Sequence, residues 1–218
     1  VYNIRWNHNQ DAKANPSSRF AASVNLGSSQ YYIESINQTN NASSLINTLS
    51  SSVSYSKTFE TIPQINFSLA GTHSQNTNTD AINMSLPNLN ASISRIFPFE
   101  PKVGSKKGII ENINLQYNLA AENRIQTTGD EFFTSKMFDN AKIGARHSIP
   151  ISTNFKIFKN ISSSLNTTYQ ETWAFSTIKR YYDPEYNEGE GRVIQDTING
   201  FDSYRTYNFS TSLGTTLY

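Results

Sequence analysis

Cysteine is absent from this chain of 218 residues, and charged residues are scarce. The lack of cysteine excludes disulfides and thiolate metal sites. Charged side chains make up 16% of the residues and the formal net charge is only +1, whereas nucleic-acid binders usually carry a basic excess. We therefore expect no nucleic-acid partner.

Long apolar runs are missing as well. No stretch approaches the roughly 18 apolar residues of a transmembrane helix, and no signal peptide is visible. These absences do not exclude a membrane β-barrel, because barrels cross the bilayer with alternating strands of about 10 residues. The first residues already alternate, with Tyr2, Ile4 and Trp6 apolar. We therefore expect the chain to start within a strand, as a piece of a longer protein would.

Aromatic and small polar residues are abundant instead. The chain contains 13 Phe, 12 Tyr and 2 Trp, and its hydrophobic fraction is 36%. Serine, threonine and asparagine supply much of the remainder. Disordered chains are also polar, but they contain few aromatic residues. This composition predicts β structure with one apolar face and one hydrated face.

Alternation with a period of two recurs along the whole sequence and indicates β-strands. Several alternating segments exceed 12 residues, whereas strands of soluble sheets usually have about 5–6 and a tilted transmembrane strand needs about 9–11. Nine strands are predicted, at 1–8, 19–31, 45–59, 64–76, 81–97, 109–122, 142–157, 160–181 and 203–218.

The connections differ in length between the two ends of the predicted strands. Long connections, at 32–44, 123–141 and 182–202, lie at one end, and tight connections, near 60–63 and 158–160, lie at the other. Outer-membrane barrels show this asymmetry. The links at 98–108 and 77–80 depart from it, in opposite senses.

The predicted fold is an all-β, antiparallel transmembrane β-barrel segment that forms a single unit over 1–218. Single-chain bacterial barrels generally have an even number of strands. An odd count of about nine therefore predicts a part of a larger barrel rather than a closed one. A soluble β-sandwich with its apolar face turned inward is the alternative.

Residues 51–73 show how the two faces are expected to differ. Small polar side chains alternate with the apolar ones and would lie on the other face, where they suit a hydrated passage without strong ion selectivity. The side chains predicted to face lipid are Val53, Tyr55, Ile65, Phe67 and Leu69. The side chains predicted to line the lumen are Ser50, Ser52, Ser54, Asn66, Ser68, Asn112, Asn114, Ser162, Ser164 and Asn166.

Two prolines interrupt strand patterns, Pro87 in LPNLNASIS and Pro150 in RHSIPISTN. Proline cannot donate a hydrogen bond to the ladder and is placed at edges or bulges. Across Pro87 the apolar positions change from even (82, 84, 86) to odd (89, 91, 93), as a one-residue bulge would produce. Both prolines are candidates for a bulge or weakened strand pairing, and a plain loop between two short strands is the alternative.

Catalytic patterns are poor. His8, His73 and His147 are scattered without the spacing of a metal site. Ser148 adjoins His147, but neighbours in a strand point to opposite faces, so this pair alone cannot form a hydrolase site. The sequence predicts no enzyme, no metal and no cofactor.

Four acidic residues lie close together in the last long connection. A calcium site is one interpretation of them, and a solvated loop is the interpretation that we favour. These residues are Asp183, Glu185, Glu188 and Glu190.

Several strings in a fixed order resemble the barrel of the lipopolysaccharide-assembly outer-membrane protein family (LptD-like). They are NTLSSSVSYSKTF, LPNLNASISRIFPF, RHSIPISTNFKIFK and YYDPE followed by DTINGF. The resemblance runs from about residue 2 to the end. It implies a large barrel in the bacterial outer membrane that holds a lipoprotein plug and is fed by a periplasmic bridge. Lipopolysaccharide would leave that barrel sideways into the outer leaflet, with no reaction in the barrel itself.

The expected function is therefore transport and insertion of lipopolysaccharide during envelope assembly, with outer-membrane lipid, a plug and bridge components as partners. The chain departs from the family plan because it has no jellyroll segment and only about nine strands. A general porin or nutrient channel shares the alternation and is the first alternative. A soluble secreted glycan-binding sandwich is the second, and it would fold in buffer without detergent.

Overall fold

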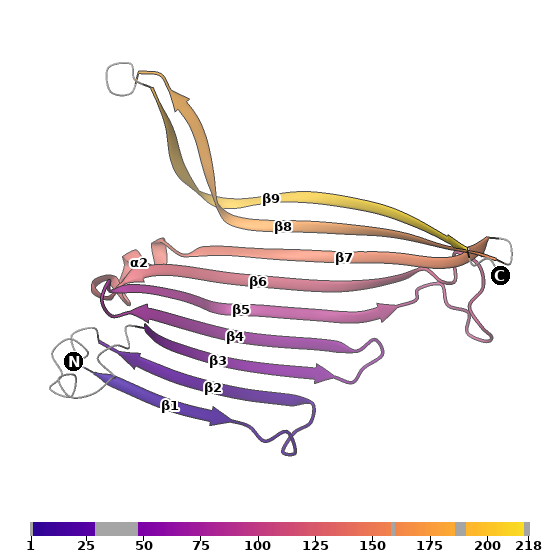
Figure 1. Cartoon of the computed structure of the whole chain (residues 1–218), viewed down its shortest axis with the longest axis horizontal. Coiled ribbons are helices and arrows are strands. Elements are labelled where there is room, and N and C mark those ends of the chain that lie inside the picture. The colour runs from indigo at the N-terminus through magenta and orange to yellow at the C-terminus, as the bar shows by residue number, and fades with distance from the viewer. Residues whose placement is uncertain (1, 29–47, 158–159, 186–190, 216–218) are drawn as a thin grey trace.

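The computed structural model describes residues 2–28, 48–157, 160–185 and 191–215, which form one antiparallel sheet of nine strands in sequence order (Figure 1). The strands are β1 (Asn3–Asn9), β2 (Ser18–Gly27), β3 (Thr48–Phe59), β4 (Ile65–Asn76), β5 (Ala81–Ile96), β6 (Asn114–Thr128), β7 (Lys142–Ile157), β8 (Ile161–Asp183) and β9 (Arg192–Thr215). Within the described residues no pairing joins β1 to β9, so the sheet is open. The prediction of an all-β fold with nine antiparallel strands is confirmed.

β6 and β9 differ most from their predicted bounds. β6 begins at Asn114 and continues to Thr128, whereas 109–122 was expected. The segment before it forms turns, in which the Asn112 side chain donates a hydrogen bond to the Gly108 carbonyl at 2.7 Å. β9 begins at Arg192 rather than 203, so much of the expected connection is strand. Polar residues break the apolar alternation there, but the backbone still pairs with β8.

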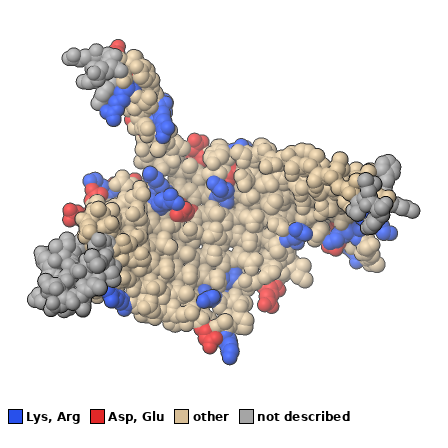
Figure 2. Space-filling view, viewed as in Figure 1, with Lys and Arg blue, Asp and Glu red and all other residues tan. Residues whose placement is uncertain are grey.

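The outer parts of β8 and β9 turn away from the sheet and form a projecting hairpin, residues 175–183 and 192–201 (Figure 1). The bend coincides with a register shift, because Ala174 pairs with Asp202 and Ser176 pairs with Asn199. Gly200 lies in this bulge with a φ of 153°, a conformation that favours glycine. Lys and Arg side chains lie on the projecting hairpin, while most of the sheet visible in the same view is uncharged (Figure 2).

The connection between β6 and β7 contains a short 3-10 helix, η3 (Gly129–Glu131), and a short helix, α2 (Ser135–Asp139). α2 packs against β6, and its Met137 is only 2% exposed. The buried apolar side chains at this end of the sheet are Leu49, Ile82, Ile125 and Met137. The small core of the described residues therefore lies at one end of the sheet, beside this connection.

Polar contacts hold this connection together. The Lys136 ammonium donates a hydrogen bond to the Glu131 carboxylate, and this bond and the attraction of the negative charge raise the pKa of Lys136. The Gly129 backbone N–H donates to Asp80 at 2.9 Å, which ties the connection to the turn between β4 and β5. No helix among the described residues is long and apolar enough to span a membrane.

Candidate functional site

The register divides the strands into two chemically different faces. Residues paired directly across an antiparallel ladder have their side chains on one face, and consecutive residues alternate between faces. We define the polar face by the row Ser56, Ser68, Asn90, Ala120, Arg146 and Thr172, in which each residue pairs with the next. We define the apolar face by the adjacent row Tyr55, Leu69, Leu89, Ala121, Ala145 and Trp173.

The residues singled out by the alternation separate cleanly between these faces. All five side chains expected to face lipid lie on the apolar face: Val53, Tyr55, Ile65, Phe67 and Leu69. Nine of the ten side chains expected to line a lumen lie on the polar face: Ser50, Ser52, Ser54, Asn66, Ser68, Asn114, Ser162, Ser164 and Asn166. Asn112 is the exception, because it lies in the turn before β6 and has no place on a strand.

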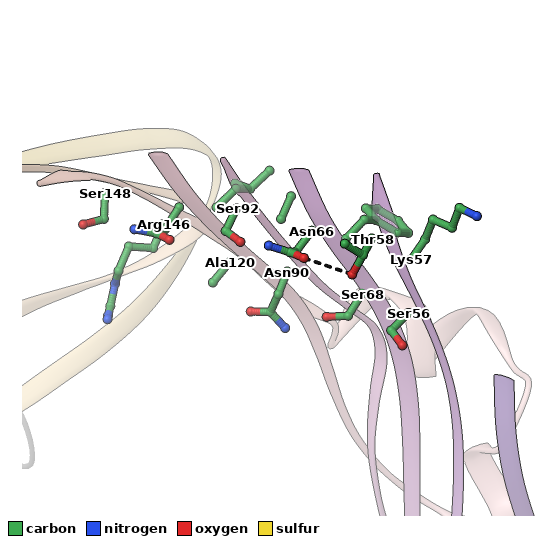
Figure 3. Close-up of a pocket in the computed structure, with 14 residues that line it drawn as sticks. Ser56, Lys57, Thr58, Asn66, Ser68, Asn90, Ser92, Ala120, Arg146 and Ser148 are labelled. Carbon is green, nitrogen blue, oxygen red and sulfur yellow. Dashed lines mark hydrogen bonds between the residues drawn. The ribbon is translucent and has the colours of Figure 1, made fainter. Parts of the chain in front are cut away.

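The sheet is hollowed on its polar face. A groove crosses β3 to β7 and is lined mainly by hydroxyl and amide groups, together with Arg146, Lys57 and apolar residues such as Phe67 and Leu119. In Figure 3, Ser56, Ser68, Asn90 and Arg146 project to one side of the strands, whereas Lys57 projects away from them. Further hollows at β1–β3 and at β7–β9 are lined mainly by polar-face residues, such as Asn7, Arg19, Ser162 and Ser212. The sheet therefore curves toward its polar face.

Pro87 lies at a register shift. Ala70 pairs with Asn88 and Thr72 pairs with Ser85, so Leu86 and Pro87 together oppose the single residue Gly71. The same two residues oppose Asn123 on β6, whose side-chain amide donates to the Leu86 carbonyl at 2.9 Å. This two-for-one arrangement keeps apolar side chains on the apolar face on both sides of the proline.

Pro150 has a different effect. Its pairing with Thr168 on β8 is continuous with its neighbours. Toward β6 the pairs stop at Asn118–Ser148 and resume at Leu115–Ile151, with the same register on both sides. A proline has no N–H to donate, so the β6–β7 ladder has a gap here without a bulge.

A polar cluster occupies the apolar face across β6 to β9, at positions where the alternation predicts apolar side chains. Glu171 is the shared acceptor: Tyr169 donates a hydrogen bond to it, the Trp173 indole N–H donates at 3.0 Å, and Arg205 Nη2 lies at 3.4 Å. His147 pairs directly with Glu171, and its Nδ1 lies 2.7 Å from the Tyr117 hydroxyl.

Within β8, Glu171 lies ten residues after Ile161, the first residue of the strand. The signal in the sequence was that Glu171 and Arg205 occupy positions that the alternation assigns to apolar side chains. Ser148, by contrast, lies on the polar face, away from His147.

We expect the Glu171 network to stabilise the pairing of β8 with β9. Glu171→Gln keeps a hydrogen-bond acceptor for Tyr169 and Trp173 but loses the ion pair with Arg205. Glu171→Leu loses both the acceptor and the ion pair, and it leaves Arg205 without a partner at this position. Urea titration of the folded protein in detergent should therefore rank the wild type above Glu171→Gln, and Glu171→Gln above Glu171→Leu. Glu171→Leu combined with Arg205→Leu should recover stability, since replacing both charges leaves neither unpaired. A Glu171→Leu variant as stable as the wild type would contradict this role.

Charged side chains are unequally divided between the two faces. Of the paired strand residues outside the projecting hairpin, the apolar face carries Lys57, Glu171 and Arg205. The polar face has six basic side chains and two acidic ones, a balance of +4: Arg5, Arg19, Arg124, Lys142, Arg146 and Lys156 against Glu122 and Asp202. The net charge of +1 for the whole chain conceals this cationic face.

The acidic group of the last connection cannot be assembled from the described residues. Asp183 ends β8, where its carboxylate accepts a hydrogen bond from the Glu185 backbone N–H at 3.0 Å. Glu188 and Glu190 lie outside the described residues. The calcium alternative therefore stays a prediction.

A protein-family model described as LptD protein matches residues 1–218. No match is found among curated proteins, and none among solved structures. The family match covers the whole chain rather than one motif.

Proposed function

The chain belongs to the LptD protein family, and on this premise we propose that it forms part of the wall of a bacterial outer-membrane β-barrel that inserts lipopolysaccharide into the outer leaflet. The family acts in transport and assembly rather than in catalysis. We accordingly propose a non-enzymatic role without a cofactor, with residues 1–218 acting as one structural unit.

The observation that carries this proposal is the pairing of a hollowed, cationic polar face with an apolar opposite face. Lipopolysaccharide joins phosphorylated sugars to acyl chains, so its passage needs a hydrated surface with hydrogen-bonding groups and positive charge. The groove across β3 to β7 offers serine and asparagine side chains for sugar hydroxyls. We therefore assign the polar face to the lumen.

The apolar face is assigned to lipid. Strands β3 to β7 have 12 to 16 residues, enough for a tilted crossing of about 9–11 residues with some excess at the rims. Apolar side chains on this face remain partly exposed, and Val53, Tyr55 and Leu69 are each between 37% and 38% exposed. Outer-membrane lipid would cover them.

The remaining partners follow from family membership. We propose that a lipoprotein plug and components of a periplasmic bridge contact the complete barrel, and that lipopolysaccharide reaches this chain from them. The edges at β1 and β9 would pair with further strands, since exposed edges invite uncontrolled pairing.

Depletion in cells tests the function directly. In the bacterium that encodes this chain, placing the complete gene under a repressible promoter should lower newly made lipopolysaccharide at the cell surface as the protein disappears. The surface pool can be measured by labelling of intact cells after a metabolic pulse, and expression of the complete gene from a plasmid should restore it. Unchanged surface lipopolysaccharide together with reduced uptake of small solutes would instead assign the protein to the porin class.

A further inference from the structure

Three cationic side chains gather on the polar face where β6 ends and β7 begins. Arg124 pairs directly with Lys142, and Arg146 lies on the same face of β7. Like charges directly opposite in a sheet are destabilising, so this arrangement calls for compensating negative charge. Glu122 provides the only acidic side chain on this face of β6 and β7 within the described residues.

Glu122 is already engaged. The Ser85 hydroxyl donates to its Oε1 at 2.9 Å, and Arg124 Nη2 lies 3.3 Å from both carboxylate oxygens. Lys142 and Arg146 are exposed, and neither has an ion-pair partner in the part of the chain that the structure describes. Lys142 and Arg146 therefore contribute two of the positive charges on this face that have no salt bridge within the described residues.

A gap separates these two cations. Gly144 is the polar-face residue of β7 between Lys142 and Arg146, and it has no side chain to fill the space. Along an extended strand, positions four residues apart, such as Lys142 and Arg146, are separated by about 13 Å. The two long side chains can reach toward each other across this distance and contact a small group between them. Glu122 lies opposite Gly144, where Ser85 and Arg124 hold its carboxylate, and the small side chain of Ala120 lies opposite Arg146.

Arg146 also belongs to the groove described above, which it lines together with Asn90, Ser92 and Ser148 (Figure 3). Hydroxyl and amide groups of this kind exchange hydrogen bonds with sugar hydroxyls, while arginine and lysine bind phosphate oxygens. The position thus joins a phosphate-binding pair to a surface suited to a glycan.

We propose that the gap over Gly144, between Lys142 and Arg146, binds a phosphate on the sugar headgroup of the glycolipid that moves along the polar face. The proposal rests on the function proposed above and adds the residues that hold the headgroup. Free phosphate has the same charge chemistry, so the test includes both sources.

Binding by the complete protein in detergent provides the test. The probes are purified lipopolysaccharide, the same material with its headgroup phosphates removed, and inorganic phosphate. Near a membrane surface each Lys or Arg contributes about 1 kcal/mol to binding anionic lipid, or about fivefold in affinity. Lys142→Gln with Arg146→Gln should therefore weaken binding of intact lipopolysaccharide by about 25-fold, and leave the dephosphorylated form unchanged.

Lys156→Gln is the matched control, because Lys156 lies on the same face at the other end of β7. This change should leave both affinities unaltered, and circular dichroism of each variant checks that the sheet is intact. Equal binding of intact lipopolysaccharide by the double variant and the wild type would overturn the site, even if depletion still removed surface lipopolysaccharide. Inorganic phosphate that binds as tightly as the glycolipid, and depends equally on Lys142 and Arg146, would assign the gap to free phosphate instead.

Discussion

Leu69→Arg is expected to prevent stable folding in a bilayer, whereas Ser68→Arg leaves the protein folded. The two residues are neighbours in β4 but lie on opposite faces of the sheet. An arginine on the lipid-facing side of a barrel costs about 2–4 kcal/mol near the bilayer midplane, whereas substitutions toward the lumen affect mainly selectivity. Leu69 lies near the middle of its strand, where this cost is largest.

The comparison is made by refolding the complete protein with each substitution into lipid vesicles and titrating with urea. Heat-dependent mobility on gels reports the folded fraction. The pair is matched in strand, in depth and in the residue introduced, so only the face differs. If Ser68→Arg is the damaging change and Leu69→Arg is tolerated, the assignment of the two faces to lumen and lipid is inverted.

Deletion of Pro87 is expected to be tolerated, whereas deletion of Ser68 is expected to abolish the fold. Without Pro87, Leu86 opposes Gly71 and Asn123 one to one, and Asn88 keeps its partners Ala70 and Glu122. The strand then becomes regular with every side chain on its present face.

Ser68 lies in a regular part of the ladder, so its loss moves one end of β4 to the wrong face. If the shorter end shifts, Ile65 and Phe67 turn to the polar face and Asn66 turns to the apolar one. Each large apolar side chain that loses its environment costs about 1.5–3 kcal/mol, or about 3–6 kcal/mol for both.

Both deletions are assessed by assembly in the outer membrane of cells and by urea unfolding in vesicles. Pro87→Ala is the control, because it keeps the two-for-one arrangement and should also fold. A folded Ser68 deletion, or loss of folding on deletion of Pro87 alone, would show that the register described for β4 and β5 does not hold.

The alternation of apolar and polar residues was sufficient to predict the strands and the face on which most of their side chains lie. Period-two alternation is a direct consequence of strand geometry, so Val53 and Ser54 could be placed on different faces without any coordinates. The phase change after Leu86 was visible for the same reason, and the register shift lies there. Strand ends were less accessible: β6 was expected to stop at 122, yet Ile125 and Thr127 continue its apolar-face row.

Pairings that depend on the third dimension could not be anticipated. The approach of Glu171 to Arg205 and of His147 to Tyr117 depends on the register between strands, which a single alternating strand does not specify. The cationic character of the polar face was hidden by acidic residues elsewhere in the chain, since composition averages over all surfaces. The start of β9 at Arg192 was missed because pairing with β8 sustains a strand whose own side chains do not alternate.

The sequential order of the strands allows the sheet to grow one hairpin at a time. Among the described residues, each strand pairs with the strands that precede and follow it in the sequence, so these pairings join segments that are near one another along the chain. Sheets dominated by such local closures lose less chain entropy per step than those that join remote strands. Each paired strand offers its free edge as the template for a neighbouring strand. Assembly of the nine described strands can therefore proceed by successive hairpins from either end of the sheet.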